Sequence, residues 1–251
     1  MFHERFVKGE SLIHSLDPRV KLIVAFLYAI MVALSSKISS LILASFFTAF
    51  LFVLSRLQIC QVLKRILTVN YFIVLLVVVM PFTFPGRVLY SLGPLAMSKE
   101  GLIYGFTLFW KSNLILTTML LLLSTAGIFN LAHALHHLHV PEKLVQLIFF
   151  SFRYIHVLQR EYQKLGAAIK LRGFSPQTNL YTYKTYAYLI ASLLIKSYDR
   201  SERVYKAMRC RGFQGMFPTY KHFQMSPRDK VFALISGIFL SLLGFYTFRP
   251  F

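Results

Sequence analysis

The sequence predicts an all-α, polytopic membrane protein with about five transmembrane helices and a cytoplasmic module of two long amphipathic helices. Of its 251 residues, 56% are hydrophobic, and several apolar runs are too long for a soluble domain. Lysine and arginine number 28 against 9 acids, and in a membrane protein such a surplus marks cytoplasmic loops and anionic headgroups. We therefore expect membrane lipid as a partner, no nucleic acid, and a multi-pass location in the cytoplasmic membrane.

Five apolar segments are expected to cross the membrane, at residues 22–34, 41–54, 66–80, 112–130 and 231–248. Asp17 and Pro18 precede the first segment and are suited to the N-cap and the first helical position. Pro81 is expected to end the third segment, and the stretch 81–99 is typical of an external loop. Lys111 interrupts the fourth apolar region, so we place it at the outer boundary of that span.

Five spans put the N-terminus inside and the C-terminus outside, in agreement with the distribution of basic residues. The apolar run 181–195 is short for a span but long enough for a helix at the membrane interface, and counting it gives the alternative of six spans.

No cleaved signal peptide is apparent, so the first segment is expected to direct insertion. Cys60 and Cys210 lie beside basic segments and are predicted to be free thiols.

Composition divides the chain into membrane helices at residues 1–130, a cytoplasmic module at 131–230 and a last membrane helix at 231–251. From residue 133 to 230 there are 16 lysines and arginines against five acids. Within this module the sequence predicts two long amphipathic helices. The first begins near Pro141, and the two helices end at Gly173 and Gly212.

The same seven-residue phrase closes both helices, as AIKLRGF at 168–174 and AMRCRGF at 207–213. Glycine commonly follows a helix end because it enters the left-handed conformation without a Cβ penalty. A basic last turn also stabilises a helix by about 0.3–1 kcal/mol, so one copy alone would be an ordinary ending. Two copies predict a repeated role, such as one kind of partner with two equivalent pockets. The candidate site residues are Ala168, Arg172, Gly173, Ala207, Arg211 and Gly212.

The histidines His133, His136, His137 and His139 suggest a different chemistry. The first three fall on one helical face, a spacing able to hold a divalent metal. The nearest acid is Glu142, so a histidine cluster at the membrane interface is the simpler interpretation, and the metal site is a weak candidate. The sequence lacks a nucleophile elbow, a zinc-protease motif and a phosphate-binding loop. We therefore expect no catalysis, no cofactor and no ATP binding by the chain itself.

Two further motifs, together with the two RGF helix ends, carry a family resemblance: LDPRVKL at 16–22, and VPEKL at 140–144 with FRYI at 152–155. Together they make the chain resemble the transmembrane T component of energy-coupling factor transporters, in the cobalt/nickel branch. The signature of that family is Ala-Arg-Gly. Leu171 and Cys210 stand where the signature has alanine, while the arginine and glycine are kept in both copies.

The resemblance implies a non-catalytic adaptor with its N-terminus and its coupling module in the cytoplasm. Its two helix tips would insert into grooves on two ATP-binding-cassette ATPase subunits, and its membrane helices would hold a substrate-binding S component. Cobalt or nickel follows from the branch, although a T component for a vitamin would look similar. Two further hypotheses stay open: a membrane-embedded metal-handling protein or enzyme that uses the His133–His139 cluster, and a structural scaffold without ATP dependence.

Overall fold

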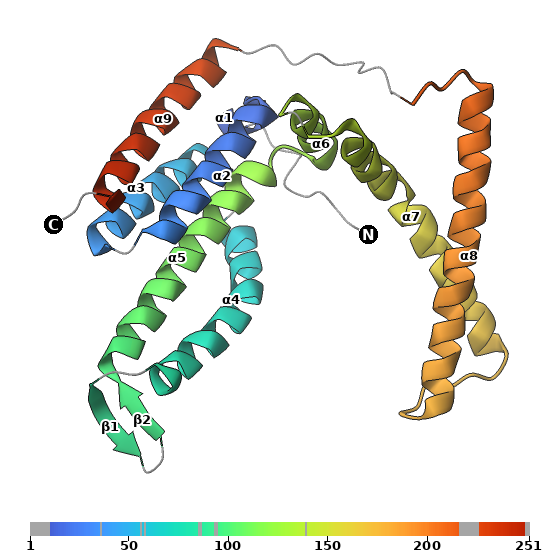
Figure 1. Cartoon of the computed structure of the whole chain (residues 1–251), viewed down its shortest axis with the longest axis horizontal. Coiled ribbons are helices and arrows are strands. Elements are labelled where there is room, and N and C mark those ends of the chain that lie inside the picture. Colours follow the sequence, from blue (N-terminus) through green and yellow to red (C-terminus); the bar gives the residue numbers. More distant parts are fainter. Residues whose placement is uncertain are drawn as a thin grey trace. The chain divides into compact units, whose positions relative to one another are not determined.

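The computed structural model describes residues 11–35, 37–55, 57, 59–84, 87–92, 95–138, 140–215 and 226–248. The helices are α1 Leu12–Ser15, α2 Pro18–Leu34, α3 Ile38–Ser55, α4 Ile59–Thr83, α5 Lys99–Leu123, α6 Ile128–His137, α7 Glu142–Leu171, α8 Leu180–Cys210 and α9 Pro227–Phe248. The strands β1 Val88–Leu92 and β2 Leu95–Ser98 form an antiparallel hairpin between α4 and α5 (Figure 1). The predicted all-α fold is confirmed, with this hairpin as an addition.

The chain forms two compact units, Met1–Leu138 with Phe223–Phe251, and His139–His222. We call the first the membrane unit and the second the helix pair. The two units are defined by the contacts within each of them. The division into membrane helices at 1–130 and 231–251 and a cytoplasmic module at 131–230 stays a prediction.

Four of the described helices are long and apolar enough to cross a membrane: α3, α4, α5 and α9. With 17 residues, α2 reaches the lower limit for a span. The run 181–195 lies in α8, which is not among the candidate spans found in the described ranges. The expected multi-pass membrane protein is thereby confirmed.

The starts of α2 and α9 lie together in the membrane unit. The Asp17 N–H donates to Asp229 Oδ1 at 2.8 Å, and the Ser226 N–H donates to Asp229 Oδ2 at 2.8 Å. Asp17 also caps α2 as predicted, because its side chain accepts from the Arg19 N–H at 2.9 Å. Five spans place the two helix starts on the same side of the membrane, whereas six would separate them, so this contact favours five.

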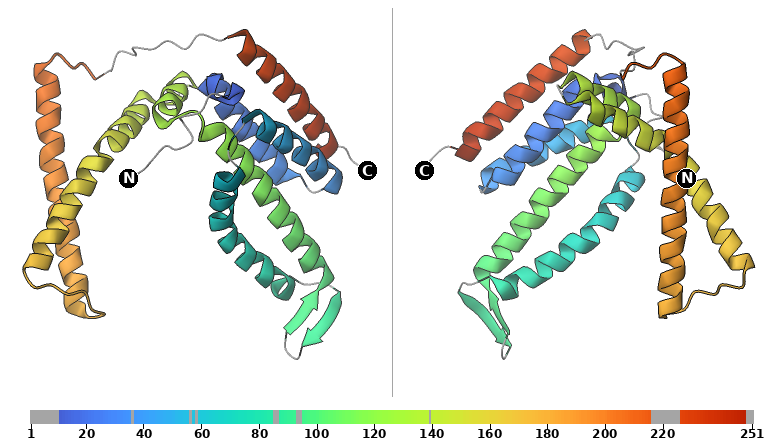
Figure 2. Two further views of the ribbon diagram at one scale, coloured as in Figure 1. Left: turned by 180° about the vertical axis from the view of Figure 1, so that it is seen from behind. Right: turned by 45° about the vertical axis from the view of Figure 1, so that its right-hand side comes forward.

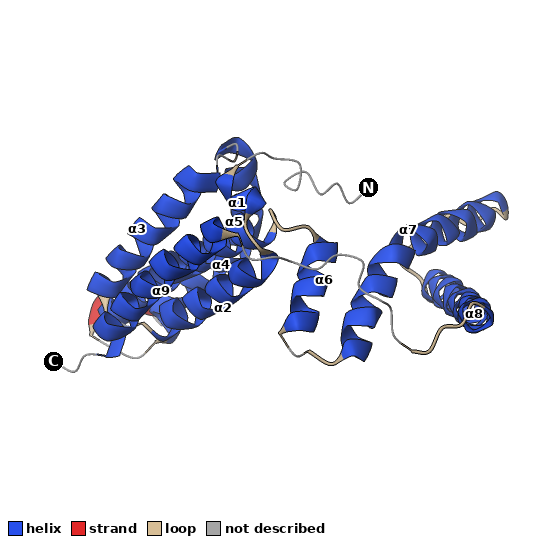
Figure 3. Ribbon diagram, turned by 90° about the horizontal axis from the view of Figure 1, so that it is seen from above, coloured by secondary structure: helices blue, strands red, loops and turns tan. Residues whose placement is uncertain are grey.

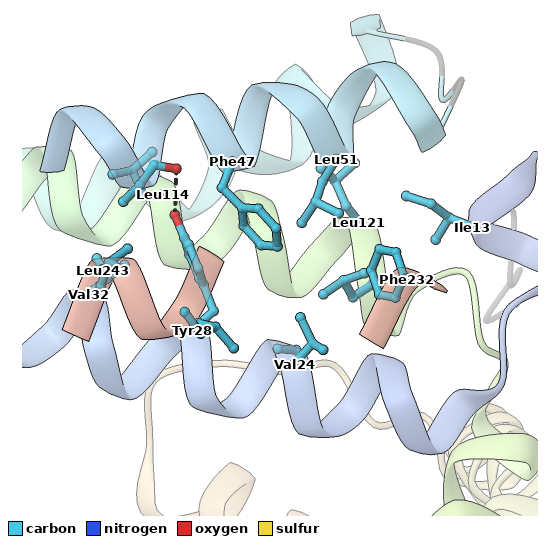
Figure 4. Packing of buried hydrophobic residues seen from close by; sticks show 14 of the residues in the cluster. Ile13, Val24, Tyr28, Val32, Phe47, Leu51, Leu114, Leu121, Phe232 and Leu243 are labelled. Carbon is cyan, nitrogen blue, oxygen red and sulfur yellow. Dashed lines mark hydrogen bonds between the residues drawn. The ribbon is translucent and has the colours of Figure 1, made fainter. Parts of the chain in front are cut away.

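The core of the membrane unit lies where α2, α3, α5 and α9 meet, and α9 packs on both α2 and α3 (Figure 3). Tyr28 is fully buried there, and its hydroxyl donates to Ala44 O at 3.1 Å, 2.7 Å from Thr48 Oγ1 (Figure 4). The Phe47 ring stacks on Phe239 with centroids 4.5 Å apart. Fully burying one such side chain stabilises a fold by about 1.5–3 kcal/mol, so these contacts hold the helices together.

The fourth span differs from its predicted range of 112–130. Helix α5 begins earlier, where the Ser98 side chain accepts from the Gly101 N–H, and the chain turns at Gly127, whose φ of 70° cannot continue a helix. The location of Lys111 at the outer boundary of the membrane stays a prediction. This residue lies in the middle of α5, and its ammonium donates to Ala33 O at 3.3 Å near the end of α2.

The prediction that Pro81 ends the third span is wrong, because α4 continues to Thr83. Proline lacks an N–H and therefore removes one backbone hydrogen bond, a loss that is small in the last turn of a helix. The Phe84 N–H still donates to Met80 O at 3.0 Å. The stretch 81–99, expected to be a loop, instead contains the end of α4 and the β1–β2 hairpin.

The helix pair consists of α7 and α8, which cross each other (Figure 2). The predicted start at Pro141 is confirmed, since this residue is the N-cap of α7. Helix α8 is capped by Asn179, whose side chain accepts from the Thr182 N–H at 2.8 Å. The predicted long helices ending at Gly173 and Gly212 are both present.

Candidate functional site

The first candidate site is the C-terminal end of α7, which we call tip 1 (residues 168–174). Arg172 is the C-cap, and Gly173 has a φ of 79°. The Gly173 N–H donates to Lys170 O at 3.0 Å, and the Phe174 N–H donates to Ile169 O at 3.3 Å. These two bonds define a Schellman motif, which satisfies carbonyls that the helix end would leave without partners.

The second candidate site is the end of α8, tip 2 (residues 207–213), and its backbone repeats this geometry. Arg211 is the C-cap, and Gly212 also has a φ of 79°. The Gly212 N–H donates to Arg209 O at 3.0 Å, and the Phe213 N–H donates to Met208 O at 3.1 Å. The repeated phrase therefore builds the same structure twice, position by position.

The two glycines are needed for their backbone conformation and not for close packing. A Cβ added at Gly173 or Gly212 would have no neighbouring atom within 4 Å. A positive φ is nevertheless strained for a residue with a Cβ, by about 1–2 kcal/mol.

The alanine and the arginine of each tip are exposed to solvent. Ala168, Ala207, Arg172 and Arg211 are all exposed, and neither arginine forms an ion pair with any described residue. Leu171, between the basic residues of tip 1, has 90% of its surface exposed. A large exposed apolar side chain beside an exposed guanidinium is suited to a partner that buries both.

The structure does not bring the two tips together. Helix α8 has 31 residues, which at 1.5 Å per residue corresponds to about 45 Å. Because tip 1 lies close in sequence to the start of α8 and tip 2 lies at its end, the tips occupy opposite ends of the helix pair (Figure 2). They can therefore contact two separate partner molecules at once.

Glu161 joins α7 and α8 where they cross. Its carboxylate lies 3.7 Å from Lys164 Nζ, 3.6 Å from Lys196 Nζ and 3.5 Å from an Arg200 guanidinium nitrogen. The Glu161 side chain is 18% exposed, less than any of its three partners. This cluster was not predicted, because the lysine and arginine of α8 are more than thirty residues away in sequence.

Hollows lie on both sides of this crossing. One, of about 400 Å³, is lined by residues that include Ile169 and Phe174 of tip 1 and Tyr186 of α8. The other, of about 290 Å³, includes Phe150 of α7 and Met208 of tip 2. The C3 residue of each Schellman motif thus lines a hollow between the helices. The sequence signal for these contacts was the apolar residue at the second position of both phrases.

Comparison with known proteins identifies the family. The profile of the CbiQ family, described as cobalt transport protein, matches residues 9–222, which include both tips. The chain belongs to the CbiQ family. The match ends before α9, so the family relationship rests on the part of the chain that contains the repeated phrase.

Curated relatives of this CbiQ chain are named energy-coupling factor transporter transmembrane protein. The one from Bacillus subtilis is 31% identical over 84% of each chain. The one from Listeria monocytogenes is 28% identical, again over 84% of each chain, and that from Streptococcus thermophilus is 26% identical over 96% of each. The chain is thus a T component of the energy-coupling factor type, a non-catalytic subunit.

The histidines of this CbiQ protein lie on and near α6. The ring centroids of His133, His136 and His137 are 4.9–6.5 Å apart, and His133 is buried. His139 lies outside the described residues. Among the residues that the structure does describe, no three side chains are arranged to hold a metal ion. The geometry therefore gives the metal-handling hypothesis no support.

Proposed function

We propose that this T component couples two ATP-binding-cassette ATPase subunits to a substrate-binding membrane subunit, with tip 1 and tip 2 as the two contact points. The observation that carries the proposal is the repeated helix end. Two exposed arginines in the same backbone geometry lie at opposite ends of one helix pair. One such end would be ordinary capping, but two suit two copies of one kind of partner.

The chemistry of the tips supports an acidic groove on each ATPase subunit. A guanidinium forms bidentate, charge-assisted hydrogen bonds with a carboxylate. At each tip the arginine lies at the C-terminal end of the helix dipole, where a cation is favoured. Removing one partner of such a pair, once it is buried at an interface, costs about 2–5 kcal/mol. Ala168 and Ala207, one turn earlier, are small enough for the groove walls to approach.

The helix pair would carry movement between the ATPases and the membrane. When ATP closes the two ATPase subunits, the distance between their grooves changes, and tips 1 and 2 follow. The Glu161 cluster holds α7 and α8 at their crossing, so displacement at the tips becomes a rotation of one helix about the other. In this proposal the N-terminus and the helix pair are cytoplasmic.

The membrane helices would hold the S component, and we propose cobalt or nickel as the transported substrate. The family description, cobalt transport protein, supports cobalt. A vitamin stays the alternative, because the curated relatives carry the transporter name without a substrate.

The test is to isolate the chain gently from its native membrane and to identify the proteins that come with it. The variant Arg172→Glu/Arg211→Glu is compared with Arg160→Glu/Arg203→Glu, which makes the same charge change at exposed mid-helix positions. We expect the wild type and the mid-helix variant to retain ATPase subunits, and the tip variant to lose them. Equal retention by both variants would refute the proposal.

A further inference from the structure

Gln146, in the second turn of α7, holds the chain just after tip 2. Its side-chain Nε2 donates to Gly215 O at 2.8 Å, between residues that are 69 apart in sequence. Gly215 has a φ of 93°, a left-handed conformation that favours glycine, and an added Cβ would meet no atom within 4 Å. The glycine is therefore needed for the turn that brings its carbonyl to Gln146, and not for close packing.

The start of α7 also borders tip 2 on the other side of its glycine. Phe150 lies one turn after Gln146, so the two side chains are on the same side of α7. Phe150 and Met208 line one hollow, and Met208 O accepts the Phe213 N–H that closes the Schellman motif. The start of α7 is thus next to the motif at residue 208 and bonded to the chain at residue 215, just after the motif.

Tip 1 is kept beside α8 in a different way. A short connection, residues 172–179, joins the end of α7 to the start of α8, so the chain itself limits how far tip 1 can move. The Phe174 ring adds contacts with Tyr181 and Tyr186 in the first two turns of α8, at centroid distances of 6.1 and 5.7 Å. Tip 2 and the start of α7 have no such connection, because most of α7 and α8 lies between them in sequence. Only noncovalent contacts can hold tip 2 there.

A contact at the crossing alone leaves α8 free to rotate about it. The Glu161 cluster holds α7 and α8 at this crossing. Gln146 lies 15 residues before Glu161, which at 1.5 Å per residue is about 22 Å along α7. A bond at that distance opposes rotation of α8, since a change in the crossing angle separates Gln146 from Gly215. Because a hydrogen bond weakens steeply when its angle falls below about 120°, this bond favours one crossing angle.

We propose that Gln146 is a positioning residue for tip 2, which it holds in place through its hydrogen bond to Gly215. The proposal rests on the coupling function above and adds the residue that places the second contact point. A tip held in its binding position needs less ordering when a partner binds. The affinity of the partner falls with the fraction of chains whose tip is in place. Tip 2 is then ready for its ATPase subunit before that subunit binds.

The test removes the hydrogen-bond donor and then restores it. Gln146→Met has a side chain of similar length without an N–H, and Gln146→Lys carries N–H donors at the same position. Gln159→Met makes the first change at an exposed position of α7 and is the matched control. Gly215→Ala disturbs the acceptor, since a φ of 93° is strained for a residue with a Cβ.

Hydrogen–deuterium exchange of the full chain in lipid nanodiscs measures the effect on tip 2 without any partner. In Gln146→Met we expect the N–H groups of Gly212 and Phe213 to exchange about two- to tenfold faster, the effect of losing one hydrogen bond. The equivalent N–H groups of tip 1 should not change and serve as an internal reference.

The other variants show whether the hydrogen bond itself is responsible. Gln159→Met should match the wild type, and Gln146→Lys should restore slow exchange at tip 2. Gly215→Ala should resemble Gln146→Met, and the combination of the two should add little, because both remove the same interaction.

A second measurement follows the ATPase subunits. Each tagged chain is isolated from its native membrane and washed with increasing salt, which weakens contacts between charged groups. We expect Gln146→Met to release the ATPase subunits at lower salt than Gln159→Met, and Gln146→Lys to retain them as the wild type does.

Unchanged exchange at tip 2 in Gln146→Met would overturn the inference. Faster exchange would also overturn it if Gln146→Met and Gln159→Met retain the ATPases equally while Arg172→Glu/Arg211→Glu loses them. If that tip variant retains them as well, the proposed function fails, and the role of Gln146 fails with it.

Discussion

Helix α2 and the helices α7 and α8 use their side chains in different ways. Over its 17 residues, α2 buries seven side chains against other parts of the membrane unit. Helices α7 and α8, with 30 and 31 residues, bury only one and two of their described side chains. A helix pair with so few buried residues gains little stability from its own packing. This difference indicates that α2 has its partners within the chain, whereas the helix pair has them outside it.

The largest effect should come from removing the guanidinium groups of both tips, because we propose that the helix pair binds its partners through them. In Arg172→Ala/Arg211→Ala we expect ATP-dependent uptake to fall to background, since each lost contact costs about 2–5 kcal/mol. The amount of inserted protein should be unchanged, because neither arginine forms an ion pair among the described residues. Uptake assays with immunoblots of the membrane fraction measure both, and uptake at the wild-type level would contradict the coupling role of the tips.

A smaller effect is expected in the membrane unit from Asp229→Ala. This change leaves the N–H groups of Asp17 and Ser226 without an acceptor, at a cost of about 1–3 kcal/mol for each buried group. We expect a lower thermal midpoint in detergent. Asp199→Ala, at an exposed position in α8, is the control and should change the midpoint little. Similar losses in both variants would remove the contrast between the two units.

Next come the glycines, which test whether the two tips are equivalent. Gly173→Ala and Gly212→Ala each place a Cβ on a residue with φ of 79°, which costs about 1–2 kcal/mol. Helicity of the purified protein on heating should fall equally in both. Gly166→Ala, inside α7 where a Cβ meets nothing within 4 Å, should instead stabilise the helix by about 0.5–1 kcal/mol. Unequal losses at the two tips would break the equivalence.

The smallest effect is expected from Glu161→Gln at the crossing. Its three partners are 38–74% exposed, and exposed ion pairs contribute about 0–1 kcal/mol. Spin labels at positions 168 and 207 should report a broader distribution of tip-to-tip distances, and high salt should broaden the wild-type distribution in the same way. Identical narrow distributions in the variant and the wild type would show that the cluster does not hold the crossing.

Features set by neighbouring residues could be predicted from the sequence. Asp17 before Pro18 indicated the start of α2, and each Arg-Gly pair indicated a helix end. The end of α5 was not predicted, because the run 112–130 contains no charged residue and its mean hydropathy does not detect the turn at Gly127. Contacts between distant residues were also missed. Asp229 with Asp17 and Glu161 with Arg200 depend on how the helices pack.

Photo-crosslinking from the two tips tests the central claim most directly. A photoreactive amino acid is placed at Leu171 or at Cys210, both exposed beside the tip arginines, and at Gln159 as the control. The transporter is then irradiated in native membranes. We expect positions 171 and 210 each to form an adduct with an ATP-binding-cassette ATPase subunit, and position 159 to form none. If neither tip forms such an adduct although the ATPases co-purify with the chain, the tips are not the coupling sites.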